Sequence, residues 1–273
     1  IFYGRSTKPI HKAIASSSTP FIQGITGNED VALKALKTSG LKLQDENRWR
    51  TISELTDEEK KRVMEAIIPY LTNSPKPGET VEDLIGSIYT LTKEDEYSYL
   101  RDSREFATLL NACGRMRAGG IGVSICMGDR SGGLKDGEKI LMEYRKSLGK
   151  YIRSTVGVEG VSIEKEKLHV IVGDEIIDEY MIGSFTSILG SMPNFKGKHI
   201  LVKTITQNKD AKISVRRSND CNSQLNFGLI MRDAALLCNG NGGGHEAAAG
   251  AKIPESQFDN FLKAVEESID KKI

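Results

Sequence analysis

Apolar positions in this chain follow two different periods, and the change between them falls near residue 155. Before that point apolar residues recur every three or four positions, as they do in amphipathic helices. From Val161 onward the pattern becomes short apolar runs separated by charged turns, which indicates strands. The expected fold class is therefore α/β, with a helical connector and insertion region followed by a compact mixed α/β domain at residues 156–273.

Helix-start signals locate the helices of the first part. Asn28 is expected to cap a helix at Glu29–Ser39, because its side chain can accept a hydrogen bond from a free backbone N–H group. The run Thr-Asp-Glu-Glu at residues 56–59 has the form of a capping box. Residues 73–78, rich in proline and glycine, are the clearest loop. Further helices are expected at Ile10–Ala15, Arg101–Arg117 and Asp136–Thr155.

The second part is expected to alternate strands with helices. The expected strands are Val161–Ile163, Leu168–Val172, Ile200–Thr206, Lys212–Arg216 and Ala251–Ile253. The expected helices are Ile182–Met192, Phe227–Leu237 and Glu255–Ile269. His11, His169 and His199 are expected to be structural or surface residues.

Composition narrows the possible functions. The 273 residues carry a net charge of only +1, so any site for a polyanion must be local. The cysteines Cys113, Cys126, Cys221 and Cys238 are widely spaced, which favours a reducing, cytoplasmic location over a disulfide framework or a zinc site. No apolar run approaches the roughly 20 residues of a membrane span, so we expect no membrane partner. The start at Ile1 is typical of a fragment.

The clearest chemical signal is the stretch Gly240–Ala251, in which Gly242, Gly243 and Gly244 precede His245. Glycine lets a ligand approach the backbone closely, and a glycine run leading into a helix start would point N–H groups at an anion. We therefore expect a phosphate site there, with His245 as a side-chain donor at its rim. The alternatives are a flexible loop before a tightly packed helix and a buried structural histidine.

Two further segments carry candidate phosphate ligands. Arg216 and Ser218 stand at the end of a predicted strand, where ligand sites of α/β sheets collect, and arginine binds phosphate with two donors. Strand alternation sends Arg217 to the opposite side, toward solvent. Asn111 and Arg115 lie near the end of the helix at Arg101–Arg117, for which the alternative is an ordinary amphipathic helix.

The string Gly-Gly-Gly-His-x-Ala-Ala-Ala-Gly resembles the signature of the DHH-associated domain, the substrate-binding half of DHH-superfamily phosphoesterases. The string Arg-Asp-x-Arg-Glu-Phe-Ala-Thr-Leu-Leu-Asn-Ala-Cys-Gly-Arg-Met resembles a segment of RecJ-type single-strand exonucleases, especially archaeal ones. The resemblance covers the chain from Gly4 to its end and implies four regions. Residues 1–40 would end the DHH catalytic domain, 41–100 would form a helical insertion, 101–155 a conserved segment with a connecting helix, and 156–273 the DHH-associated domain.

The resemblance also implies what the chain lacks. The family holds its two metal ions, Mn²⁺ or Mg²⁺, in an N-terminal domain with an Asp-His-His motif, and this sequence has no such motif. We therefore expect no catalytic residue, no metal ligand and no bound cofactor in this chain. The glycine-rich residues 119–133 contain no nucleotide-binding pattern.

The expected function is the nucleic-acid-binding portion of a RecJ-like exonuclease that hydrolyses single-stranded DNA or RNA from the 5′ end. Its expected partner is single-stranded nucleic acid, bound but not cut by this chain alone. One alternative is a non-catalytic replication-associated scaffold that binds GINS and other replisome proteins. A third is a nanoRNase or phosphatase of the DHH type, against which the RecJ-like segment argues.

Overall fold

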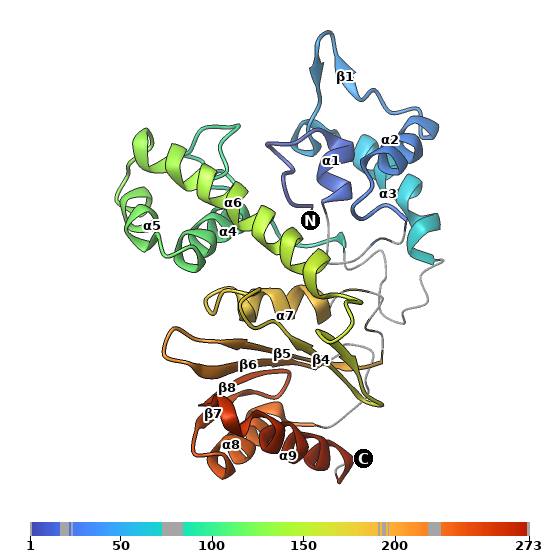
Figure 1. Cartoon of the computed structure of the whole chain (residues 1–273). Coiled ribbons are helices and arrows are strands. Elements are labelled where there is room, and N and C mark those ends of the chain that lie inside the picture. The colour runs from blue at the N-terminus through green and yellow to red at the C-terminus, as the bar shows by residue number, and fades with distance from the viewer. Residues whose placement is uncertain are drawn as a thin grey trace. The chain divides into compact units, whose positions relative to one another are not determined.

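The computed structural model describes residues 2–16, 22, 24–72, 84–190, 192, 195, 197–217 and 225–271 (Figure 1). The chain divides into two compact units. Unit 1 takes in Ile1–Gly114 and Gly119–Glu138, and unit 2 takes in Arg115–Ala118 and Lys139–Ile273. The fold class is the predicted one, α/β.

Unit 1 is mainly helical. Its helices are α1 (Ile10–Ala15), α2 (Glu29–Thr38), α3 (Asp57–Thr72), α4 (Ser103–Arg115), α5 (Gly119–Cys126) and the beginning of α6 (Gly132–Thr155). The short strands β1 (Gln44–Asp45) and β2 (Arg48–Trp49) form an antiparallel pair, followed by the 3-10 helix η1 (Ile52–Glu54). The predicted helices of this part are confirmed, and the predicted loop at residues 73–78 lies outside the described residues.

The predicted caps in unit 1 are confirmed. The Asn28 side chain accepts a hydrogen bond from the Val31 N–H group at 3.1 Å. The Thr56 hydroxyl accepts from the Glu59 N–H group at 3.2 Å, while the Glu59 carboxylate accepts from the Thr56 N–H group at 3.0 Å. These local hydrogen bonds satisfy donors that a helix start leaves free, which is why they could be predicted from sequence.

Helix α5 was not predicted, because glycines at 119, 120 and 122 disfavour helix in isolation. Packing supplies the reason for two glycines in this region. A Cβ at Gly122 would lie 3.4 Å from the Cβ of Cys113, and one at Gly137 would lie 2.7 Å from Cδ1 of Ile125. Tertiary contacts between α4, α5 and α6 therefore override the local propensity.

The segment before α1 is tied to the start of α4. The Glu105 carboxylate accepts hydrogen bonds from the Gly4 N–H group at 2.9 Å and from the Thr7 hydroxyl at 3.2 Å. Arg5 pairs with Asp102 at 3.1 Å. Burial raises the pKa of Glu105 above its ordinary value of 4.5. Arg5 therefore has a structural partner within unit 1.

Unit 2 is built around a six-stranded sheet in the order β3-β4-β5-β6-β8-β7. Its strands are β3 (Ser162–Glu164), β4 (Leu168–Val172), β5 (His199–Ile205), β6 (Asp210–Arg216), β7 (Asn241–His245) and β8 (Ala248–Pro254). Strands β4 and β5 pair in parallel, and the other neighbours pair antiparallel. Its helices besides α6 are α7 (Ile182–Gly190), α8 (Phe227–Leu237), α9 (Phe258–Asp270) and the 3-10 helix η4 (Glu255–Gln257).

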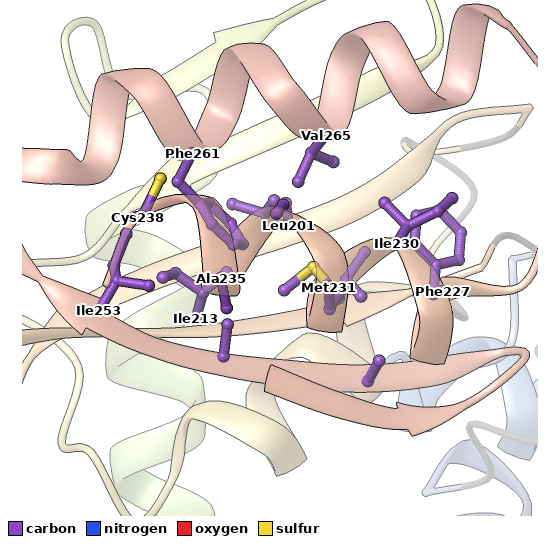
Figure 2. Packing of buried hydrophobic residues seen from close by; sticks show 14 of the residues in the cluster. Leu201, Ile213, Phe227, Ile230, Met231, Ala235, Cys238, Ile253, Phe261 and Val265 are labelled. Carbon is purple, nitrogen blue, oxygen red and sulfur yellow. The ribbon is translucent and has the colours of Figure 1, made fainter. Parts of the chain in front are cut away.

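The helices of unit 2 lie on both faces of this sheet (Figure 1). Helices α8 and α9 cover one face, where Phe227, Met231 and Phe261 pack against Leu201 and Ile213 of the strands (Figure 2). Helix α7 covers β5 and β6 on the other face with a second core. That core includes Phe185, Leu189, Ile200 and Val202.

Two of the histidines are structural in unit 2, as predicted. The His169 ring shares a hydrogen bond with the Ser162 hydroxyl at 2.7 Å and meets Phe195 edge-on. The His199 ring is buried against Phe227, and burial lowers its pKa to about 4. Neither ring therefore belongs to the candidate site described below.

Candidate functional site

The glycine run forms an edge strand and not the start of a helix. Gly242–Gly244 lie in β7, residues 246–247 make a turn, and Ala248 begins β8. The prediction of N–H groups at a helix N-terminus is therefore wrong. The turn is anchored by the carbonyl of Glu246, which accepts from the Phe227 N–H group at 3.0 Å, and by that of Ala247, which accepts from the Arg217 N–H group at 2.9 Å.

Close packing of α8 against β7 requires glycine at several of these positions. A Cβ at Gly242 would lie 2.3 Å from the carbonyl oxygen of Met231, and one at Gly228 would lie 2.3 Å from that of Gly244. Gly243 is different, because a Cβ there would meet nothing within 4 Å. Its φ of +153° is one that other residues rarely adopt. Gly242 and Gly244 thus serve packing, while Gly243 faces open space.

Strand pairing brings the distant candidates onto one face. Arg216 on β6 and His245 on β7 are both register partners of Ala248 on β8. Register partners on neighbouring strands project to the same face, and strands lie about 4.8 Å apart, so the Cα atoms of Arg216 and His245 are about 10 Å apart. In the next row Gly250 of β8 separates Ser214 from Gly243.

We call this face the Arg216 surface. Its members are Arg216, Ala248, His245, Ser214, Gly250 and Gly243.

The Arg216 side chain lies along helix α7. Its Nε donates to the Ser187 hydroxyl at 2.9 Å, and one terminal nitrogen donates to the Gly183 carbonyl at 3.4 Å. A Cβ at Gly190 would lie 3.7 Å from the Cβ of Arg216. Small residues at successive turns of α7 therefore provide the space in which the guanidinium lies, and Ala248 of β8 is the register partner of Arg216.

Arg115 adds a second positive charge beside Arg216. Burial, and then the nearby Arg115, lowers the pKa of the Arg216 guanidinium. Arg115 is exposed and donates to the backbone carbonyl of Tyr180 at 3.2 Å. Within the described part of the chain, neither arginine has a carboxylate within ion-pair distance. Two guanidinium groups that repel each other electrostatically and lack an acidic partner are typical of a site that binds an anion.

Comparisons with known proteins agree with these features. A family model of the DHH-CID domain matches residues 2–85, and one of the DHHA1 domain matches residues 166–271, which include the Arg216 surface. This chain carries a DHH-CID domain and a DHHA1 domain. It belongs to the DHH superfamily.

Individual proteins resemble this chain at low sequence identity. An uncharacterized protein from Methanocaldococcus jannaschii is 32% identical over 274 residues, covering 100% of this chain and 55% of the relative. The chain thus spans about half the length of that protein. CDC45 from Entamoeba histolytica has a similar fold, with a TM-score of 0.52, 12% identity and coverage of 97% of this chain and 56% of CDC45. RecJ from Thermus thermophilus gives a TM-score of 0.47 and 17% identity over 78% of this chain and 30% of RecJ.

The other predicted residues have different outcomes. Ser218 lies outside the described residues. Asn111 is exposed on α4 in unit 1, whereas the DHHA1 domain lies in unit 2. Arg217 is half-buried and donates to the Leu225 carbonyl at 3.5 Å, so it does not point into open solvent as predicted. The His245 side chain is exposed and makes no hydrogen bond or ion pair with the described residues.

Sequence reasoning missed the residues that support the arginines. Ser187 and Gly183 receive hydrogen bonds from Arg216, and the Tyr180 carbonyl receives one from Arg115. The only signal in the sequence was the spacing of small residues along the predicted helix at 182–192, which placed Gly183, Ser187 and Gly190 on one face. That pattern does not reveal which side chain packs against it.

No group of three His, Cys, Asp or Glu residues within the described ranges is placed to hold a metal ion. None of the helices in the part of the chain that the structure describes is long and apolar enough to cross a membrane.

Proposed function

We propose that this chain is the nucleic-acid-binding part of a RecJ-like, metal-dependent exonuclease that degrades single strands from the 5′ end. The observation that carries the proposal is Arg216, a partly buried arginine beside Arg115, without an acidic partner among the described residues and in register with His245. The motif resemblance and the match to the DHHA1 domain support it. The proposed phosphate contacts are Gly242, Gly243, Gly244, His245, Arg216, Ser218, Arg115 and Asn111.

In this proposal the chain binds a strand but does not cut it. Mn²⁺ or Mg²⁺ would be held by residues outside this chain. Arg216 and Arg115 would each neutralise a phosphate and release condensed counterions, so binding should weaken steeply as salt rises. Phosphate recognition of this kind does not distinguish DNA from RNA.

Fluorescence anisotropy with a labelled single-stranded oligonucleotide tests the proposal. The R216A variant is expected to bind more weakly than the wild type and to reduce the slope of log K against log[salt] by about 0.7, the value for one lost contact on a single strand. R232A is the matched control, because Arg232 is an exposed arginine on α8, on the other face of the sheet. Equal affinities for R216A and R232A at every salt concentration would refute the proposal.

A scaffold that binds replisome proteins such as GINS is the second candidate function. The observation that favours it is a run of exposed apolar side chains after residue 84, with Ile85 68% and Tyr89 70% exposed. Exposed large apolar residues in a cluster mark protein-binding surfaces. A pull-down with purified GINS distinguishes the two candidate functions. If the chain is a scaffold, I85S/Y89S should abolish capture of GINS and R216A should leave it unchanged. Capture that does not respond to I85S/Y89S would exclude this surface.

A further inference from the structure

The register of the Arg216 surface continues along β6 to a second group of side chains. Lys212 lies four residues before Arg216 and pairs with Lys252 of β8. Alternate residues of a strand share a face and each residue adds about 3.4 Å, so Lys212 lies about 14 Å from Arg216 on the same face. The Lys212 ammonium lies 5.7 Å from the ring centroid of Tyr180, which stands two residues before the start of α7.

Tyr180 is an exposed aromatic residue held in place by cations. It is 44% exposed, and the Arg117 guanidinium lies 4.6 Å from the centroid of its ring. Its backbone carbonyl accepts the hydrogen bond from Arg115, the residue that borders Arg216. Tyr180 therefore lies between these cations and stays partly open to solvent.

The charges around Tyr180 cancel only in part, because no ion pair with a described residue neutralises Lys212 or Arg115. Arg117 pairs with Asp178 at 3.1 Å, and Lys252 pairs with Asp210 at 2.8 Å. The exposed ring beside Arg117 suits a group with a π face, because nucleobases stack on tyrosine and on the planes of arginine side chains.

We propose that Tyr180 stacks a nucleobase of the strand whose phosphate lies at the Arg216 surface, on the part of its ring that Arg117 and Lys212 leave exposed. This inference rests on the proposed function and makes it more specific. It implies that the DHHA1 domain binds a strand that extends beyond the phosphate site, and that the base contact tolerates any sequence, since every base has a π face.

The test compares two labelled strands of equal length, oligothymidylate and its fully abasic counterpart, with the full chain by fluorescence anisotropy. Y180A is expected to bind the base-bearing strand roughly five- to 150-fold more weakly than the wild type, and the abasic strand equally well. Y180F should retain wild-type affinity for both strands. Y180L keeps an apolar side chain without the π face and should behave like Y180A.

The outcomes separate this inference from the proposed function. If Y180A and Y180L weaken the binding of both strands by the same factor, Tyr180 only positions Arg115 and the stacking inference is wrong. If Y180A and Y180L change the affinity for neither strand while R216A weakens the binding of both, the stacking inference is again wrong but phosphate binding stands. If R216A weakens neither strand, the proposed function itself fails.

Discussion

Replacing Gly242 with alanine tests whether the glycine run is fixed by the packing of α8 on β7. The new Cβ would lie 2.3 Å from the carbonyl oxygen of Met231 and 3.0 Å from the Cβ of Ala235. Ordinary contact begins at 3.4 Å, and the nearest atom belongs to the backbone, so no side chain can turn away to make room. Helix and strand must therefore separate by roughly 1 Å.

The size of the effect follows from this overlap. Forcing an extra methyl group into a packed interior costs about 1–3 kcal/mol. Gly242 is not among the residues with a positive φ, so alanine adds no backbone strain and the cost is steric. With about 2–4 °C of Tm per kcal/mol for a chain of this size, G242A should lower the Tm by roughly 2–12 °C.

Thermal unfolding followed by circular dichroism measures this shift. G149A is the matched control in α6, because its Cβ would meet nothing closer than a guanidinium nitrogen of Arg153 at 3.5 Å. Alanine is also favoured over glycine inside a helix by about 1 kcal/mol, so the Tm of G149A should stay or rise. A G242A variant that melts within about 1 °C of the wild type would refute the packing explanation.

Three further predictions concern titration and reactivity. Burial raises the pKa of Glu105 above 4.5. The free energy of unfolding should therefore fall as pH rises from 4.5 through the pKa of the folded state. Urea unfolding of E105Q, measured over the same pH range, should lack this fall. Burial lowers the pKa of His199 from 6.5 to about 4, so stability should drop by about 3 kcal/mol as pH falls from 6.5 to 4, and H199L should flatten that dependence. Cys126 is exposed whereas Cys113 and Cys238 are buried, so a thiol reagent should modify Cys126 first in the folded chain; equal rates at the three sites would contradict this.

Elements governed by local signals could be predicted from the sequence. Helix α8 begins at Phe227 and ends at Leu237, as predicted, because Asn226 caps its start. The capping box at residues 56–59 succeeded for the same reason. The prediction for the glycine run was wrong, because small residues fit a helix or a strand equally well and only the packing of α8 decides between them.

The candidate site could be predicted in part. Arg216 and His245 were named from motifs, but only the pairing of three strands brings them to one face. Ser187 and Tyr180 could not be named, because their roles depend on which arginine packs against α7 and its start. Ser218 and Asn111 stay predictions.

The packing of Arg216 on α7 links positions that lie far apart in the chain. Its Nε donates to the Ser187 hydroxyl at 2.9 Å, and its Cβ lies 3.7 Å from where a side chain at Gly190 would begin. A lineage that enlarged residue 187 or 190 would displace the guanidinium, whereas one that had lost the arginine would be free to enlarge both. Among related proteins, whether residues 187, 190 and 216 change together should therefore separate proteins that still bind an anion from those that have kept only the fold.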